Sequence, residues 1–247
     1  MVFEYEQLGE HIKIAVSPEH KFGTDAFLLS DFAKVKKKDY AADLGTGCGI
    51  VAMLWFRPGV NGEDNGPKKA YCVDIQTQAI EQLKQTVEEN SLHDRVVPMC
   101  MDLKNINSSL LPQELDVVTC NPPYKIEGTG ILNDADPHTI ARHEVMCTIN
   151  DVCAAAAKML KFGGRLCVCQ RPERLADVLQ AMRQNGIEPK RVRFVQKRHD
   201  SAPWLFLAEG KKGSKPYMNV EAPLVVQDEK GELTAEMKRI YMLYATK

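Results

Sequence analysis

Short apolar runs alternate with longer amphipathic segments from about residue 40 onward. Ala79, Leu83 and Val87 recur every four residues, which predicts one apolar face on a helix. The same pattern predicts strands at Tyr40–Leu44, Ala70–Ile75, Val96–Met101, Leu115–Cys120, Arg165–Gln170, Val192–Gln196 and Trp204–Ala208, and helices that begin near Cys48 and cover Gln76–Glu89, Ile149–Leu160 (closed by Phe162-Gly163-Gly164) and Pro172–Gln184.

Regular alternation of strands and helices is typical of βαβ units and a mostly parallel sheet. The last two strands are separated by a short polar turn, so we expect them to form an antiparallel hairpin at one end of the sheet. The sequence therefore predicts an α/β fold with a doubly wound, mostly parallel sheet. We divide the chain into an N-terminal extension packed on the core (1–39), a main domain (40–217) and a small C-terminal tail (218–247).

Composition excludes several classes of protein. Of the 247 residues 44% are hydrophobic and 26% are charged, and the net charge is −1, all ordinary for a globular chain and unlike collagen or a disordered protein. We find no apolar run long enough to span a bilayer, and the first residues do not resemble a signal peptide. The eight cysteines include no CxxC pair, so we expect reduced thiols, no metal site, no membrane partner and a cytoplasmic location.

A glycine-rich loop follows the first predicted strand of the main domain, in the sequence DLGTGCG from Asp43 to Gly49. Glycines permit a tight turn and let a ligand approach the backbone closely. The loop departs from the dinucleotide pattern G-x-G-x-x-G, whose third glycine would stand where the chain has Ile50. The carboxylate of Asp43 suits a cationic ligand better than a pyrophosphate. S-adenosylmethionine, which carries a sulfonium and an ammonium group, fits both observations.

Two further acidic residues close the next two predicted strands. Asp74 ends the second strand, where a carboxylate accepts hydrogen bonds from ribose hydroxyls in nucleotide-binding sheets. Asp102 ends the third strand, where we expect it to meet the adenine amino group, with Leu103 in backbone or apolar contact. Three acidic strand ends beside one glycine loop predict a nucleoside-containing cofactor.

A second loop, Asn121-Pro122-Pro123-Tyr124, follows the fourth predicted strand. Two prolines fix the backbone and remove two N–H donors, so this loop is stiff and rich in acceptors. The side-chain oxygen of Asn121 and the carbonyl of Pro122 suit the two hydrogens of a substrate –NH2 group, and Tyr124 offers an aromatic face for a planar group. We therefore assign Asn121, Pro122 and Tyr124 as catalytic residues.

Together these motifs resemble the class I S-adenosylmethionine-dependent methyltransferases of the Asn-Pro-Pro-Tyr group, over roughly residues 20–210. The segments Lys21–Leu29 and Ala141–Glu144 are similar to those of the bacterial valine-tRNA adenine-N6 methyltransferases. The resemblance implies a Rossmann-like fold and these cofactor-binding residues: Thr24, Asp25, Asp43, Gly45, Thr46, Gly47, Gly49, Asp74, Ile75, Asp102, Leu103 and Asn121. For Thr24 and Asp25 a simple helix cap is an equally good interpretation.

The resemblance further implies N6-methylation of an adenine in valine tRNA, next to the anticodon. We expect the protein to be a monomer. Methylation of a protein glutamine amide and of a guanine N2 amine in ribosomal RNA remain alternatives, because the same loop accepts either planar amine. A binding module without activity is the alternative outside enzymes; the intact cofactor and Asn-Pro-Pro-Tyr loops argue against it.

A tRNA substrate needs a basic surface, which the net charge of the whole chain does not indicate. Residues 171–215, however, hold eleven Lys and Arg against five acidic residues. A local basic patch binds phosphates even on a neutral protein, although lysines at a sheet edge also serve simply to prevent aggregation. We assign RNA contacts to Lys190, Arg191, Arg193, Lys197 and Arg198.

Overall fold

The structure is a computed structural model, and it describes residues 3–9, 12–17, 22–58, 63–106, 114–122 and 147–242. Tyr124 and the segment 141–144, which carried part of the resemblance, lie outside the described residues. Within the described ranges, no helix has the length and apolar character needed to cross a membrane.

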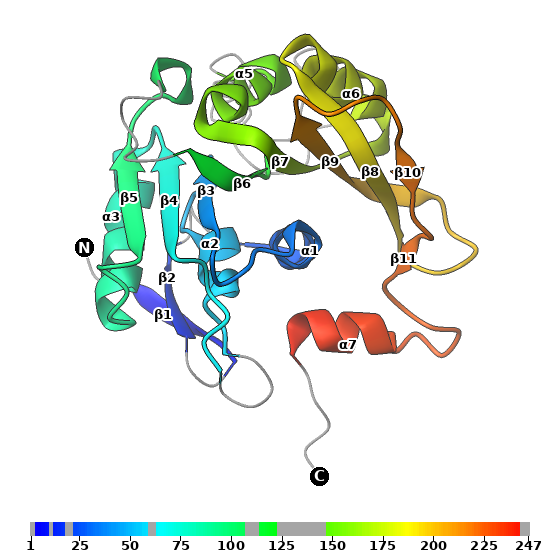
Figure 1. Ribbon diagram of the computed structural model, residues 1–247. Helices are drawn as coiled ribbons and strands as arrows, with labels where there is room; N and C mark the ends of the chain where they lie inside the picture. Colours follow the sequence, from blue (N-terminus) through cyan, green and yellow to red (C-terminus); the bar gives the residue numbers. More distant parts are fainter. Residues whose placement is uncertain are drawn as a thin grey trace, which may run out of the picture.

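The helices and strands alternate along the chain as the sequence predicts (Figure 1). The helices are α1 Thr24–Ala33, α2 Ile50–Trp55, α3 Thr77–Glu89, α5 Ile149–Met159, α6 Leu175–Gln184 and α7 Ala235–Tyr241, with 3-10 turns η1 Leu103–Asn105 and η3 Pro172–Arg174. The strands are β1 Glu4–Leu8, β2 Ile12–Val16, β3 Tyr40–Leu44, β4 Lys69–Asp74, β5 Val96–Cys100, β6 Leu115–Cys120, β7 Leu160–Gln170, β8 Ile187–Gln196, β9 Pro203–Lys212, β10 Asn219–Val220 and β11 Leu224–Val225.

The main sheet has the order β10-β8-β9-β7-β6-β3-β4-β5, with β11 also paired to β8. The strands from β5 to β7 are parallel neighbours, and β8 and β9 form the antiparallel hairpin that the sequence predicts. From β3 the chain moves outward to β4 and β5, whereas β6 lies on the other side of β3 and leads outward to β7. The strand order therefore reverses between β3 and β6, and such a reversal opens a crevice at the carboxyl ends of the two strands.

The seventh strand differs from the prediction. We expected the helix to run to Leu160 and the glycines to close it, but β7 begins at Leu160 and contains both Gly163 and Gly164. The pairing of β6 with β7 shifts register here, and a Cβ on Gly164 would lie 2.9 Å from the carbonyl oxygen of Leu115. The two glycines thus permit an irregular start of the strand. In the sequence alone, the same two glycines look like the end of a helix.

Helices cover both faces of the sheet. Helices α1, α2, α3 and α7 belong to one apolar cluster, and α5 and α6 to the other (Figure 1). The β1–β2 hairpin packs on α3, where Gln82 and Thr86 bond the backbone of Ala15. All eight cysteines are free thiols.

The C-terminal segment, which we predicted to be a small tail, adds two strands and a helix to the main domain. Strands β10 and β11 pair with β8 in parallel and extend the sheet. Helix α7 packs on α1, where the hydroxyls of Thr24 and Tyr241 lie 2.8 Å apart and Arg239 forms a bidentate ion pair with Asp31. Residues 218–242 therefore buttress the helix that precedes the glycine loop.

Candidate functional site

The glycine loop leaves β3 in a sharp turn that only glycine adopts without strain. Gly45, Gly47 and Gly49 all have positive φ, at 65°, 54° and 87°. A Cβ on Gly49 would lie 2.4 Å from the Cδ1 atom of Leu83 in α3, so this glycine is also needed for packing. A Cβ on Gly45 or Gly47 would meet nothing within 4 Å. The first two glycines therefore border open space, as a ligand-binding loop requires.

The carboxylate of Asp43 is buried at the base of this loop, with a side chain 2% exposed. The hydroxyl of Thr119 donates to its Oδ1 atom at 2.6 Å, and the hydroxyl of Thr46 donates to its Oδ2 atom at 2.7 Å. Burial raises the pKa of Asp43 to about 6, and these two hydrogen bonds oppose the rise. A carboxylate held in this way is suited to a cationic ligand group, which would stabilise its ionised form.

Asp74 shapes the loop from the neighbouring strand. Its Oδ2 atom accepts a hydrogen bond from the backbone N–H of Gly47 at 2.8 Å, and its Oδ1 atom accepts one from Gln76 at 2.9 Å. Next to it, the apolar side chain of Ile75 is 41% exposed. Asp74 therefore already has a structural role in fixing the glycine loop, and its contact with a ribose stays a prediction.

A cavity of about 180 Å³ opens between the glycine loop, the start of α1 and the end of β6. It is lined by Phe22, Gly23, Ala26, Asp43, Gly45, Thr46, Gly47, Cys48, Ile50, Val51 and Asn121. An apolar wall, a buried carboxylate and glycines that leave space beside the backbone fit the methionine end of S-adenosylmethionine. The residues predicted on the loop and at Asn121 thus meet in one place.

The upstream segment lies at this cavity, but through other residues than we predicted. Phe22, Gly23 and Ala26 line the cavity, whereas the hydroxyl of Thr24 is bonded to Tyr241. The N-cap position of α1 belongs to Gly23 and shows no side-chain cap, so neither Thr24 nor Asp25 caps the helix in the way we considered.

Asp102 and Leu103 flank the end of β5. The side chain of Asp102 accepts a hydrogen bond from the N–H of Lys104 at 2.9 Å and so caps η1. Leu103 is half-buried against the apolar cluster beneath α5. Their contacts with an adenine ring stay a prediction.

Asn121 stands directly after β6, beside the glycine loop. The buried thiol of Cys169 in β7 donates to the Oδ1 atom of Asn121 at 3.1 Å and so helps to orient the amide. Pro122 follows in a buried position, and Tyr124 lies outside the described residues. An amide oxygen has two lone pairs and can accept two hydrogen bonds.

Two of the five predicted RNA contacts are structural arginines. Arg191, with a side chain 14% exposed, is paired with Glu209 and Glu221, and its guanidinium lies 3.9 Å from the ring centre of Phe32. Arg193 forms a bidentate pair with Glu236, at 2.7 and 2.8 Å. Both side chains share one face of β8, as alternation requires, and that face packs on α1 and α7, so both guanidinium groups are engaged in internal ion pairs.

Lys190 is likewise engaged. Its ammonium group donates to the carbonyl of Lys215 at 3.1 Å and lies 5.8 Å from the ring centre of Tyr217. Lys197 and Arg198, in contrast, are exposed on the turn between β8 and β9. The charge count along the sequence could not separate these cases, because acidic partners such as Glu209 and Glu236 come from other elements.

Thr119 is a site residue that the sequence analysis missed. It pairs in register with Asp43 across β6 and β3, and its side chain is fully buried. The available signal was the strand order together with the register: with β6 beside β3 and both strands ending at the same edge, Thr119 lies level with Asp43.

A sheet with this order of strands, and a glycine-loop cavity at its point of reversal, is Rossmann-like, and the loop and cavity fit S-adenosylmethionine. The sequence of residues 19–188 matches the family model of the methyltransferase small domain. Because this match covers more than half of the chain, the protein belongs to that family, and S-adenosylmethionine is its cofactor.

Individual relatives agree with this assignment. The chain is 26% identical over 183 residues to a tRNA1(Val) (adenine(37)-N6)-methyltransferase of Phocaeicola vulgatus, covering 74% of this chain and 73% of the relative. It is 23% identical over 222 residues to the enzyme of the same name from Parabacteroides distasonis, covering 89% and 84%. In fold it is similar to a solved structure from Agrobacterium tumefaciens described as a predicted O-methyltransferase, with a TM-score of 0.69, 18% identity and coverage of 89% and 96%.

Proposed function

We propose that the protein transfers a methyl group to the N6 amine of an adenine in tRNA, the reaction that the names of both bacterial relatives state for those enzymes. The observation that carries the proposal is the position of Asn121. Its amide lines the cavity of the glycine loop and stands at the start of the acceptor-rich Asn-Pro-Pro-Tyr loop. By the relatives' names, the target is adenine 37 of valine tRNA.

For this reaction the protein must position the target amine and provide hydrogen-bond acceptors for its two hydrogens. When bound, S-adenosylmethionine supplies the methyl group in an electrophilic, sulfonium-linked form. The Oδ1 atom of Asn121 and the carbonyl of Pro122 accept the two hydrogens of the target amine. These bonds hold the amine in line with the methyl group and favour lone-pair density on nitrogen, which is otherwise delocalised into the purine ring. The methylated nitrogen is acidic and loses its proton to solvent, so no dedicated base is required.

The target base must leave its stack to reach the cavity. Extrusion costs a few kcal/mol, and less for an unpaired base in a loop. We assign Tyr124 as the aromatic platform that offsets part of this cost, because stacking of a base on an aromatic side chain contributes about 1–3 kcal/mol. The two magnitudes are comparable, which favours a loop adenine over a paired one.

The test is incubation of the purified protein with methyl-labelled cofactor and, in separate reactions, with bulk tRNA, ribosomal RNA and peptide-chain release factors. Nucleoside and amino-acid analysis then identifies the product. We expect N6-methyladenosine in tRNA. Label in N2-methylguanosine of ribosomal RNA, or in N5-methylglutamine of a protein, would overturn the assignment of the substrate while leaving the cofactor and the role of Asn121 in place.

A further inference from the structure

The turn between β8 and β9 stands on the same edge of the sheet as Asn121. Cys120 pairs with Val168 of β7, Val168 with Ala208 of β9, and Ala208 with Val192 of β8. In this row of paired residues β6 ends, at Cys120, whereas β8 continues from Val192 to Gln196 before the chain turns. The turn, which is the amber loop at the right of Figure 1, therefore lies beyond this row of paired residues in the direction in which β6 and β8 both run.

The separation between the two points suits a short stretch of single strand. Three strand spacings and about four residues of additional rise give roughly 20 Å from Asn121 to Lys197 for a flat sheet. A few nucleotides of extended chain span that distance. Phosphates that flank a base held at Asn121 would thus come within reach of the turn.

The turn presents cationic side chains on a rigid backbone. Ser201 accepts a hydrogen bond from the N–H of Arg198 at 2.8 Å and donates to the carbonyl of Arg198 at 2.7 Å. The carbonyl of Lys197 accepts a bond from Gln227 at 2.8 Å, which ties the turn to the C-terminal segment. The side chains of Lys197, Arg198 and His199 are exposed, and Arg198 forms a long pair of 3.5 Å with Asp200, itself 76% exposed.

A further cation lies between the turn and Asn121. Arg171 directly follows β7, and its guanidinium donates to the carbonyl of Trp204 at 3.0 Å and lies 5.6 Å from the ring centre of Trp204. This contact fixes the guanidinium at the carboxyl edge. We call Arg171, Trp204, Lys197, Arg198 and His199 together the edge track.

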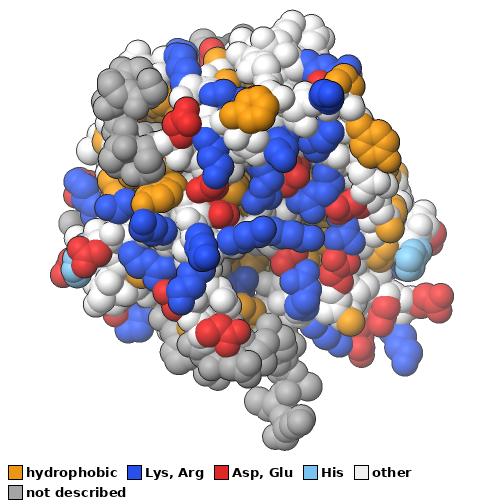
Figure 2. All heavy atoms as spheres, viewed as in Figure 1, with side chains coloured by type: hydrophobic (Ala, Val, Ile, Leu, Met, Phe, Trp, Pro, Cys, Tyr) orange, Lys and Arg blue, Asp and Glu red, His pale blue; other side chains and the backbone are white. Residues whose placement is uncertain are grey.

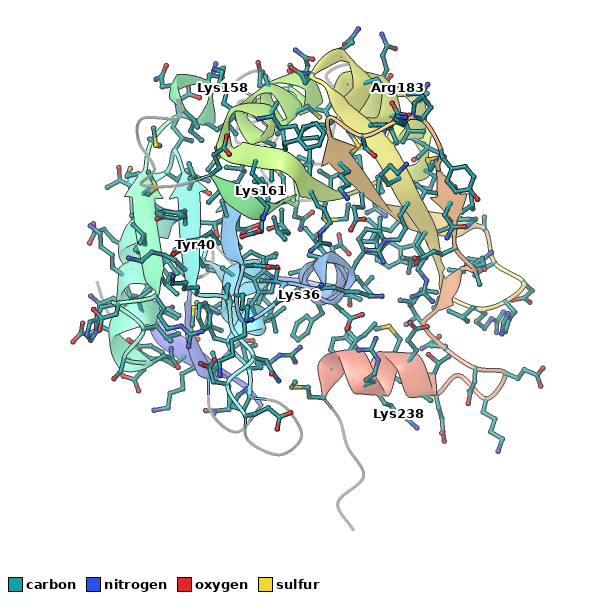
Figure 3. The ribbon with its side chains drawn as sticks, viewed as in Figure 1. Lys36, Tyr40, Lys158, Lys161, Arg183 and Lys238 are labelled. Atoms are coloured by element: carbon teal, nitrogen blue, oxygen red, sulfur yellow. The ribbon has the colours of Figure 1, made fainter. Side chains whose placement is uncertain are left out.

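Another basic surface lies elsewhere on the molecule. Figure 2 shows many Lys and Arg side chains on one face, with Asp and Glu between them. Lys36, Tyr40 and Lys161 lie on this face in Figure 3, and Tyr40 and Lys161 mark the amino ends of β3 and β7. That face is therefore at the opposite edge from Asn121, which makes it a poor position for phosphates next to the reacting base and a suitable control surface.

We propose that the edge track binds the phosphates of the single-stranded RNA segment that flanks the target adenine. This inference rests on the proposed function. It replaces Arg191 and Arg193, whose guanidinium groups are engaged in internal ion pairs, with Arg171, which lies at the carboxyl edge. It retains Lys197 and Arg198, which are exposed. The edge track positions the strand and leaves the choice of base to the cavity.

The experiment compares two double variants of the full chain that remove the same charge. Lys197→Ala/Arg198→Ala alters the edge track, and Lys36→Ala/Lys37→Ala alters exposed lysines at the opposite edge. Affinity for tRNA is measured against salt concentration, together with KM for tRNA and affinity for the cofactor. We expect the edge-track variant to lose about 0.7 of salt slope for each phosphate contact removed, and its KM for tRNA to rise several-fold at unchanged cofactor affinity. The control should match the wild type.

Equal salt slopes for the two variants and the wild type would overturn the edge track, and so would a reduced slope in the opposite-edge control alone. Either result is interpreted only after the wild-type protein has been shown to methylate tRNA. In that case the proposed function remains valid, and only the edge track is overturned. A wild type that methylates a protein amide and no RNA would instead overturn the proposed function, and the edge track with it.

Discussion

Thr119 donates a hydrogen bond of 2.6 Å to Asp43 across the two strands between which the sheet reverses its order. The bond holds the carboxylate on which we expect the cationic end of the cofactor to bind. We expect Thr119→Val, which keeps the shape but not the hydroxyl, to lower cofactor affinity, because the bond opposes the rise in the pKa of Asp43 and orients its carboxylate. The strength of a hydrogen bond to a charged group, about 1.5–3 kcal/mol, sets the upper limit of this loss. Calorimetric titration checks this. Thr119→Ser is the control and should bind nearly as the wild type does.

Cofactor affinity should depend on pH through Asp43. Burial raises the pKa of Asp43 from 3.8 to about 6, so in the ligand-free protein the carboxyl gains a proton as the pH falls through about 6. A protonated Asp43 offers no charge to the cofactor, and affinity should decrease below that pH. Titrations between pH 5 and 8 measure the effect. An Asp43→Asn variant with the same pH profile as the wild type would show that another group is responsible.

The same group has the opposite effect on the stability of the ligand-free fold. Because the folded protein binds this proton more tightly than the unfolded chain does, the contribution of Asp43 to stability is fully present below about pH 3.8 and is lost as the pH rises through about 6. The difference between wild type and Asp43→Asn in urea unfolding, followed over pH, isolates this contribution.

Substitution of two glycines in the same loop should affect different properties of the protein, stability for Gly49 and cofactor affinity for Gly47. Gly49→Ala combines a strained φ of 87° with a contact of 2.4 Å to Leu83, and we expect it to cost about 2–5 kcal/mol of unfolding free energy. Gly47→Ala meets no neighbour, so only the strain of about 1–2 kcal/mol applies, but it adds a methyl group where the cavity is lined. Its main loss should be cofactor affinity. Equal losses of stability in the two variants would contradict this distinction.

Removing the amide of Asn121 should affect turnover more than binding. We expect Asn121→Ala to lower kcat by about 10²-fold, the size typical for the loss of one preorganised polar contact in a reacting site. Cys169→Ser keeps a donor to the amide and should retain most activity, whereas Cys169→Ala should lower kcat with little change in KM. Single-turnover kinetics separate these effects. Parallel losses of kcat and of stability in Cys169→Ala would reduce Cys169 to a packing role.

Arg191 should behave as a structural residue. It is held between Glu209 and Glu221, and removal of one partner from a buried ion pair typically costs about 3–5 kcal/mol. Arg165 also pairs with Glu209 at 2.9 Å, so we expect Arg191→Ala to fall at the lower end of that range. Urea unfolding measures the loss. A variant that stayed fully stable but bound tRNA weakly would restore Arg191 as a phosphate contact.

The sequence predicted the elements and the glycine loop well because both depend on local properties. Alternating apolar runs define β3 to β6 wherever they later pair, and glycine is required at φ values that few other residues adopt. The partners of a side chain are a different matter. Whether Arg193 faces a phosphate or Glu236 depends on how α7 packs, and the wall of the cavity depends on where α1 lies. Neither follows from spacing along the chain, so the sequence could not separate arginines in internal ion pairs from exposed cations.

The contact between α1 and α7 has a consequence for how the protein is made. Phe22, Gly23 and Ala26 form one wall of the cavity, and the helix that carries this wall rests on Tyr241 and Arg239. On a ribosome, the glycine loop and β6 emerge long before α7 does. The newly synthesised chain therefore has the floor of the pocket first, and α7 adds its contacts last to a helix that also packs on α2, β6, β7 and β9. The wall of the pocket therefore gains its last contacts only with α7, the final helix that the structure describes.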